Sequence, residues 1–277
     1  MPELAEVAFF AKQWGRAVGE RVERVHLHAG ARDLREVDPA ALVVDLTGAR
    51  LLAAEARAKQ ALFRFESGSL GVHLGMAGRL SVAPAEMVPD KHDHLVLFTE
   101  RTALVFSDYR MFGKVLWHAG AELPEWWTAL PPEVLSEAFT REAVGAFLQR
   151  RGRAPIKAVL LMQARFPGIG NWMADEILWR ARIRPDCPAG RIAGRKLSEL
   201  FDAIREVASD AMREIAEDGR SILSHELSKE LPETWLFNHR WRDGGHCPRT
   251  GKALVREAIG GRTTCWSPAW QRWPRDG

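Results

Sequence analysis

The residues best suited to chemistry lie at the start of the chain, in the stretch Met1-Pro2-Glu3-Leu4-Ala5-Glu6. Initiator methionine is normally removed when a small residue such as proline follows, so we expect the mature chain to begin with Pro2. An α-amino group has a reference pKa of ~7.7–8.0, and its unprotonated form can attack an electrophilic carbon. A secondary amine that condenses with a sugar aldehyde gives a charged iminium, which withdraws electrons from the sugar. The alternative is that Pro2 is an ordinary second residue and that Glu3 and Glu6 are solvated.

Two other stretches contain groups that could bind an anion. In Phe166-Pro167-Gly168-Ile169-Gly170-Asn171 a glycine-flanked turn leads directly into a predicted helix, and free N–H groups at a helix start attract phosphate. Asn171 would cap this helix or reach a phosphate. The alternative is that the glycines only allow close packing. Lys59 interrupts an apolar segment and would place one ammonium near a turn between strands.

Composition restricts the class of protein. At 277 residues with 46% hydrophobic residues, the chain can form one large domain or two to three smaller ones. It contains no run of 18 apolar residues and no signal-peptide pattern, so we expect a cytosolic protein without a membrane span. The three cysteines Cys187, Cys247 and Cys265 lack paired spacing, which argues against a disulfide framework and against a CxxC metal site.

Positive charge is concentrated near the end of the chain, although the net charge is only +3. Residues 240–275 carry eight basic side chains against Asp243 and Glu257; the eight are Arg240, Arg242, Arg249, Lys252, Arg256, Arg262, Arg272 and Arg275. Such a module can bind a polyanion, or it can simply be a solvated face.

The elements that must position these residues follow from periodicity. Residues 3–18 show helical spacing that ends at Gly19, which places Pro2 at the start of an opening helix. Short strands separated by turns then predict a β-sandwich of about 100 residues. The strands are expected at Arg21–His28, Leu42–Leu46, Ala49–Ala58, Gln60–Phe65, Leu70–Leu74, His94–Thr99 and Ala103–Phe106.

The second half changes character after a proline-containing linker. Apolar periodicity between about residues 136 and 218 predicts helices, and the last forty residues predict a hairpin of strands 253–258 and 263–266 joined by Gly260-Gly261. We therefore expect a catalytic β-sandwich domain at 1–118, a linker at 119–135, a helical domain at 136–230 and a hairpin module at 231–277.

Six motifs, taken in order, resemble the formamidopyrimidine-DNA glycosylase/endonuclease VIII family over essentially the whole chain. They are Pro2-Glu3-Leu4-x-Glu6-Val7, Ala58-Lys59, His73-Leu74-Gly75-Met76-x-Gly78, Asp108-x-Arg110-x-Phe112-Gly113, Gly168-Ile169-Gly170-Asn171 and Arg262-Thr263-Thr264. The resemblance implies an α+β multidomain fold: an N-terminal β-sandwich with flanking helices, a helical helix-two-turn-helix domain and a C-terminal β-hairpin finger.

The resemblance also implies catalytic roles. Pro2 matches the nucleophile that attacks C1′ of the damaged nucleotide, and Glu3 matches the catalytic acid. Lys59 matches a lysine that contacts phosphate beside the lesion and supports catalysis. Glu6 matches a further carboxylate near the site, whose role we expect to be mainly structural.

Six more residues match the family's DNA-binding set. Base flipping leaves a void in the duplex, and the family's three void-filling residues correspond to Met76, Arg110 and Phe112; without the resemblance, Met76 and Phe112 would be read as core residues. The phosphate-binding asparagine, a backbone-contacting lysine and the hairpin arginine correspond to Asn171, Lys157 and Arg262.

The hairpin departs from the family pattern, which commonly has a CxxC…CxxC zinc finger. Three of the four ligand positions here hold Thr250, Ser267 and Trp270, which cannot form a tetrahedral zinc site. We therefore predict a zincless finger, with the metal replaced by apolar packing of Trp266, Trp270 and Trp273. Activity is not excluded, because the family includes zincless members.

Two further departures concern the turn and the substrate. Ala5 replaces the usual proline, which loosens the turn after the nucleophile. The segment between Gly219 and Cys247 shows little of the lesion-capping loop pattern of the 8-oxoguanine enzymes. We expect formamidopyrimidines, oxidised pyrimidines, hydantoins or abasic sites as substrates rather than 8-oxoguanine.

These inferences predict a bifunctional DNA glycosylase/AP lyase of base excision repair that nicks the strand by β,δ-elimination. It would need no cofactor or metal, because the iminium supplies the electron sink. We expect a monomer that binds damaged double-stranded DNA, not membranes, in the bacterial cytoplasm at the nucleoid. Two alternatives remain: a non-catalytic damaged-DNA-binding protein of the same fold, and a lyase mainly for abasic, single-stranded or crosslinked DNA.

Overall fold

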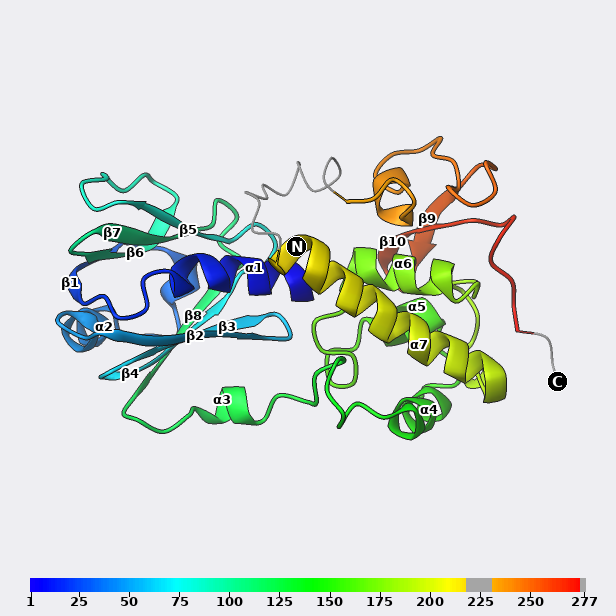
Figure 1. Cartoon of the computed structure of the whole chain (residues 1–277), viewed down its shortest axis with the longest axis horizontal. Coiled ribbons are helices and arrows are strands. Elements are labelled where there is room, and N and C mark those ends of the chain that lie inside the picture. Colours follow the sequence, from blue (N-terminus) through cyan, green and yellow to red (C-terminus); the bar gives the residue numbers. More distant parts are fainter. Residues whose placement is uncertain (218–230, 275–277) are drawn as a thin grey trace. The chain divides into compact units, whose positions relative to one another are not determined.

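The computed structural model describes residues 1–217 and 231–274, and the chain divides into two compact units, Met1–Leu130 and Pro131–Gly277. The first unit contains two four-stranded antiparallel sheets, with strand orders β1-β6-β7-β5 and β2-β3-β4-β8 (Figure 1). Its elements are α1 (Leu4–Gly15), β1 (Val22–Leu27), η1 (Arg32–Leu34), α2 (Pro39–Leu46), β2 (Leu51–Arg57), β3 (Gln60–Phe65), β4 (Gly68–His73), β5 (Arg79–Pro84), β6 (Asp93–Thr99), β7 (Thr102–Ser107), β8 (Lys114–Ala119) and α3 (Glu125–Thr128).

Helix α1 is fixed against strands of both sheets. Trp14 is fully buried, its ring lies 4.6 Å from that of Phe63 on β3, and its Nε1 donates to the Ser81 carbonyl on β5 at 3.0 Å. Burial of such a large ring is worth several kcal/mol. The sandwich core therefore sets the position of the helix whose first turn follows Pro2.

Several predicted boundaries need correction. The segment Leu42–Leu46, predicted as a strand, belongs to helix α2. The Asp38 carboxylate accepts from the amides of Ala40 at 2.9 Å and Ala41 at 3.3 Å, and Pro39 fits the first helical turn, so local capping outweighs the strand preference of the valines. The opening helix ends at Gly15, and strands β5 and β8 were not predicted.

The second unit combines the helical region with the hairpin. Its elements are α4 (Arg141–Arg150), α5 (Ile156–Leu160), α6 (Asn171–Arg180), η2 (Ala189–Arg191), α7 (Gly194–Ala211), η3 (Met212–Glu217), η4 (Leu236–His239), β9 (Val255–Ile259) and β10 (Arg262–Trp266). A stacked pair of rings, Phe139 and Phe201, joins the segment before α4 to α7 with centroids 5.7 Å apart. The predicted lesion-capping segment lies partly outside the described residues.

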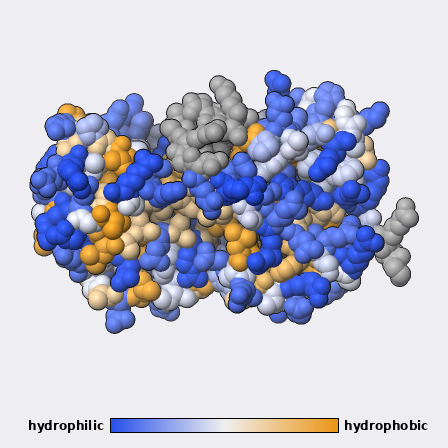
Figure 2. Space-filling view, viewed as in Figure 1, coloured by the Kyte–Doolittle hydropathy of each residue, from blue (hydrophilic) through white to orange (hydrophobic). Residues whose placement is uncertain are grey.

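Hydrophilic residues cover most of the face seen in the space-filling view, with smaller hydrophobic patches between them (Figure 2). Within residues 1–217 and 231–274, none of the helices has both the length and the apolar character that a membrane span requires.

Candidate functional site

The first turn of α1 is held by a reciprocal pair of carboxylates. Glu3 is the N-cap residue, its side chain accepts from the Glu6 amide, and Glu6 Oε2 accepts from the Glu3 amide at 3.1 Å. This is a capping box. Both side chains are buried, so the alternative that Glu3 and Glu6 are solvated is wrong. Glu6 therefore fixes the backbone that carries Glu3 and the adjacent Pro2.

Lys59 lies in the turn between β2 and β3, directly after Ala58, whose φ is +57°. It is 8% exposed, which rules out a simply solvated lysine. Burial lowers the pKa of His73 on β4, and the positive charges of Lys59 and Lys114 lower it further. His73 Nδ1 accepts from the Gly75 amide at 3.1 Å, so Lys59 lies near the strand end where the Met76 loop begins.

The structure brings Met76, Arg110 and Phe112 together in the first unit. The Met76 loop joins β4 to β5, and the Arg110 and Phe112 loop joins β7 to β8. A Cβ on Gly75 would lie 2.4 Å from the carbonyl carbon and oxygen of Phe112, so glycine allows the two backbones to touch. Met76 is 41% exposed and Phe112 52% exposed, so neither is a core residue.

The shape of the second loop depends on one buried carboxylate. Asp108 Oδ1 accepts from the amide of Arg110 at 3.0 Å, and its Oδ2 accepts from the amides of Phe112 at 2.9 Å and Gly113 at 2.7 Å. The Arg110 guanidinium lies 5.1 Å from the centroid of the Phe112 ring. The backbone is therefore fixed while Arg110 and Phe112 project outward.

Asn171 joins the helices of the second unit to the hairpin. It is the first residue of α6, and Gly170 is the N-cap, so the prediction that Asn171 itself caps the helix is wrong. Its side-chain amide donates to the Thr263 carbonyl on β10 at 2.8 Å. The next residue back along that strand is the exposed Arg262, so both predicted phosphate ligands lie where α6 meets the hairpin.

Lys157 occupies a different place from the one expected of a lysine that contacts the DNA backbone. Its side chain is fully buried, and Nζ donates to the Asn171 carbonyl at 2.6 Å and to Asp175 Oδ1 at 2.5 Å. Asp175 Oδ2 accepts from Arg240 Nη2 at 2.7 Å and from the amide of Cys265 at 3.0 Å. Buried charges require such partners, and here they attach the hairpin to α5 and α6.

The hairpin tip also contacts α5. Gly260 and Gly261 have φ values of +60° and +75°, which glycine adopts readily. A Cβ on Gly260 would lie 2.6 Å from the Ala158 side chain, so the tip fits against α5 only because this residue is glycine.

The positions that would correspond to zinc ligands hold a hydrogen-bonded cluster around Cys247. Burial opposes ionisation of this thiol, but the hydroxyls of Thr250 and Ser267 and the indole of Trp179, whose Nε1 donates to Sγ at 3.4 Å, hold its pKa below the ordinary value. Trp270 Nε1 donates to the Trp179 carbonyl at 3.0 Å. Among the described residues, no group of three or more His, Cys, Asp or Glu side chains is arranged to hold a metal ion.

Of the three tryptophans expected to replace the metal, one packs against this cluster and a second is buried. Trp270 packs against the buried group formed by Trp179, Leu236, Cys247 and Cys265, and Trp266 is itself buried. Trp273 differs: it is 41% exposed, and its Nε1 donates to Asp186 at 3.1 Å. Gln271, which was not predicted as important, bridges the amide of Ser267 and the carbonyl of Ile183 at 2.7 and 2.9 Å.

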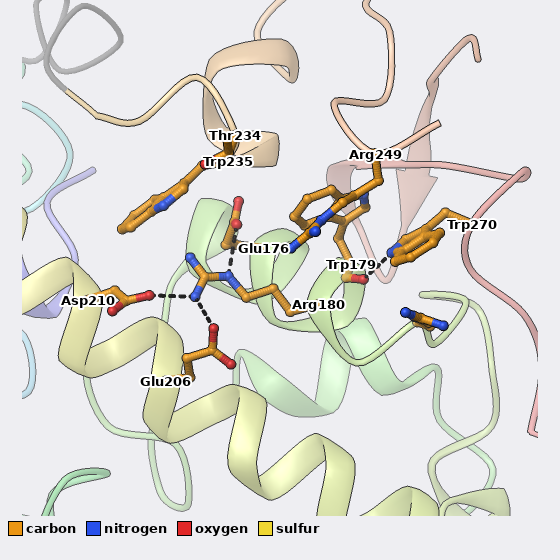
Figure 3. Close-up of a pocket in the computed structure, with 10 residues that line it drawn as sticks. Glu176, Trp179, Arg180, Glu206, Asp210, Thr234, Trp235, Arg249 and Trp270 are labelled. Carbon is orange, nitrogen blue, oxygen red and sulfur yellow. Dashed lines mark hydrogen bonds and ion pairs between the residues drawn. The ribbon is translucent and has the colours of Figure 1, made fainter. Parts of the chain in front are cut away.

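A cavity of about 340 Å³ lies at the other end of α6. Figure 3 shows Arg180 among the residues that line it. Its guanidinium donates hydrogen bonds to Glu176, Glu206 and Asp210 at 3.1, 2.8 and 2.6 Å. Burial raises the pKa of Glu176 to about 7, although Arg180 and backbone amides favour the ionised form. Trp235 and Arg249 also line this cavity.

The two units resemble known domains. Residues 1–115 match the formamidopyrimidine-DNA glycosylase N-terminal domain, and residues 130–222 match the formamidopyrimidine-DNA glycosylase H2TH domain. A formamidopyrimidine-DNA glycosylase of Xanthomonas axonopodis is 35% identical over 98% of this chain and its own full length. A protein of that name from Roseiflexus is 36% identical with the same coverage.

Solved structures agree with these relatives. Lactococcus lactis formamidopyrimidine-DNA glycosylase, bound non-covalently to DNA that contains an AP site, has a TM-score of 0.83 and 25% identity, covering 98% of this chain and 99% of that one. A complex of MutM with DNA containing carbocyclic 8-oxoguanine has the same score and identity, covering 98% of this chain and 100% of that one.

Proposed function

Because the chain belongs to the formamidopyrimidine-DNA glycosylase family, we propose that it is a DNA glycosylase of base excision repair that also cleaves the resulting abasic site. The observation that carries this proposal is the buried capping box at the start of α1, which fixes Glu3 directly after Pro2. The substrate would be damaged double-stranded DNA. Such a substrate would place the protein in the cytoplasm at the bacterial nucleoid.

The proposed reaction starts once Met1 has been removed, because the nitrogen of Pro2 is otherwise part of a peptide bond. The free amine attacks C1′ of the damaged nucleotide, a C–N bond forms, and the bond from C1′ to the base breaks. Glu3 supplies the proton that the sugar oxygen or the departing base requires. The C1′–O4′ bond of the sugar then breaks, O4′ takes up a proton, and the nitrogen lone pair forms the C1′=N iminium. This iminium acidifies the neighbouring C2′–H, so loss of that proton drives β-elimination of the 3′-phosphate, and δ-elimination then expels the 5′-phosphate.

Lys59 supports this reaction by charge. Its ammonium is held in a tight turn with only 8% of the residue exposed, so a phosphate that approached it would meet a positioned, partly desolvated cation. The exposed groups of the neighbouring loops fit the next task, because Met76 and Phe112 are apolar wedges and Arg110 can hydrogen-bond the unpaired base.

The second unit would hold the DNA backbone. We propose that Asn171 and the exposed Arg262 contact phosphates, and that Lys157 acts through them by fixing the start of α6 and the hairpin. We also propose that the finger works without zinc. Hydrogen bonds of Cys247, Gln271 and Asp175 would hold it in place, as a bound metal would otherwise do. Formamidopyrimidines, oxidised pyrimidines, hydantoins and abasic sites are the proposed substrates.

Borohydride trapping tests the enzyme proposal. Wild type and Pro2→Gly would be incubated with duplexes that contain an abasic site, 8-oxoguanine or dihydrouracil. We expect a covalent adduct with wild type and far less with Pro2→Gly. Pro39→Ala, a change at a proline on α2, serves as the matched control. A wild type that forms no adduct with any of the three duplexes would overturn the enzyme proposal.

A further inference from the structure

A closed polar cluster lies beneath the loop that carries Arg110 and Phe112. It consists of Asp33 on η1, His94 on β6 and Asp108 at the end of β7, all with 0% exposure. His94 Nδ1 is hydrogen-bonded to Asp33 Oδ2. Burying two carboxylates and an imidazole in one place is costly unless the groups are paired, so the location of this cluster requires an explanation.

Both carboxylates of the cluster meet the loop at Gly113. A Cβ on Gly113 would lie 3.0 Å from Asp33 Oδ1 and 3.2 Å from Asp108 Oδ2, so both carboxylates lie against this backbone. Gly113 directly follows Phe112, and its amide donates to Asp108. Asp33 therefore limits where Asp108 and Gly113 can lie, and these two residues determine the direction of the loop.

The pairing within the cluster is incomplete. Asp33 Oδ1 and His94 Nε2 are buried without a hydrogen-bond partner among the described residues. Burial raises the pKa of Asp33, the hydrogen bond from His94 opposes this shift, and the charge of Asp108 adds to it. A pair that served only the stability of the sandwich would be replaced at little cost by apolar side chains. Buried polar atoms without a partner require an explanation, and here Asp33 Oδ1 lies against the backbone of Gly113.

We propose that Asp33 and His94 are positioning residues that set the direction in which the loop from Asp108 to Gly113 presents Arg110 and Phe112 to DNA. The proposal rests on the proposed function of those two side chains as void fillers. Asp33 acts by holding Asp108 and Gly113 in place, and His94 acts by orienting the Asp33 carboxylate. Neither residue touches the substrate. The step that depends on them is opening of the duplex, not the attack by Pro2.

The loop contains its own probe. Tyr109 is the only tyrosine of the chain, and it is 62% exposed. Selective isotope labelling of tyrosine therefore gives a single NMR signal that reports the conformation of this loop. We expect Asp33→Asn to shift or broaden this signal in the DNA-free protein. An unchanged signal would overturn the proposal.

A matched control is available at the other end of the same strands. The Glu20 side chain is 8% exposed, and it accepts from Thr99 Oγ1 at 2.5 Å and Thr102 Oγ1 at 3.1 Å. Glu20→Gln removes a buried carboxylate from the ends of β6 and β7 that lie away from Asp108. It should leave the Tyr109 signal unchanged, even where its effect on thermal stability equals that of Asp33→Asn.

The functional test compares duplex with single-stranded DNA under single-turnover conditions, where the single strand contains a preformed abasic site and needs no base flipping. For Asp33→Asn and His94→Gln we expect about a tenfold slower reaction on the damaged duplex. Borohydride adduct formation on the single strand should stay within twofold of wild type. Equal losses on both substrates, or no loss on the duplex, would overturn the positioning role. Absence of any adduct with wild type would instead overturn the enzyme proposal itself.

Discussion

The ammonium of Lys157 and the carboxylate of Asp175 form a fully buried ion pair, with Nζ and Oδ1 2.5 Å apart. The pair joins α5 to α6, and the same carboxylate accepts the amide of Cys265 from the hairpin. A lysine in a DNA-binding unit thus contributes to the internal structure of that unit.

Replacing Lys157 by methionine should therefore mainly lower the free energy of unfolding. The variant leaves Asp175 with Arg240 as its remaining cation, and loss of one partner of a buried pair costs about 3–5 kcal/mol. Urea unfolding followed by fluorescence measures this loss. Arg195→Met removes an exposed positive charge of the same unit and serves as the control. Its free energy of unfolding should change by less than about 0.5 kcal/mol. A Lys157→Met protein as stable as wild type would contradict this account.

Arg262→Ala should weaken DNA binding without lowering stability. The side chain is exposed, so the free energy of unfolding should change by less than about 0.5 kcal/mol. DNA affinity should fall for every sequence alike, and the slope of log K against log salt should decrease in magnitude by about 1, since one phosphate contact is lost. Fluorescence anisotropy at several salt concentrations measures both quantities, and an unchanged slope would exclude the phosphate contact.

Glu6→Ala tests the capping box. Loss of one of its two hydrogen bonds should lower stability by ~1 kcal/mol. It should also slow adduct formation at abasic sites, because the backbone of Glu3 and Pro2 loses its support. Glu6→Gln keeps an acceptor oxygen and should retain most of both properties. If Glu6→Gln were as slow as Glu6→Ala, the negative charge rather than the hydrogen bond would be the property that matters.

Glu176 should make stability depend on pH in a defined direction. Its pKa is raised from 4.5 to about 7 by burial, so between these values the folded protein binds a proton that the unfolded chain has already released. The contribution of Glu176 to stability is therefore greatest below pH 4.5 and decreases as pH rises to about 7. Relative to Glu176→Gln, wild type should lose up to ~3 kcal/mol across this range. Denaturant unfolding of both proteins at several pH values measures this change, and a wild type that gained stability relative to Glu176→Gln as pH rose would have the wrong sign.

Metal removal should leave the finger intact. Because we propose a finger without zinc, we expect EDTA to shift the thermal midpoint by less than about 1 °C and elemental analysis to find no stoichiometric zinc. Gln271→Ala should lower the midpoint by several degrees, since Gln271 bridges two backbone groups. Stoichiometric zinc in the purified protein would overturn the zincless proposal.

Local patterns predicted much of this molecule. Strand Gln60–Phe65 was predicted to the residue, because its apolar run and flanking turns lie within the segment itself. Leu42–Leu46 was predicted wrongly, because its helix depends on a cap at Asp38 rather than on the propensity of the valines. The motifs also single out Met76, Arg110 and Phe112, which the structure places on exposed loops.

Relationships between distant residues could not be predicted in this way. Lys157 and Asp175 are 18 residues apart, and Asp33 and His94 are 61 apart. A lone lysine on a short helix is expected to be exposed, and only the carboxylate of the next helix makes its burial tolerable. Periodicity contains no information about which buried charges meet.

The groups that attach the hairpin affect how the protein would respond to oxidising conditions. Oxidants that damage DNA bases also attack thiolates, and oxidation of a thiolate ligand would release a bound metal. Asp175 and Gln271 hold the hairpin through a carboxylate and an amide, which such oxidants leave unchanged, and the thiol of Cys247, the third group that holds the finger, is buried. A repair protein built in this way would continue to bind DNA during the oxidative stress that creates its substrates.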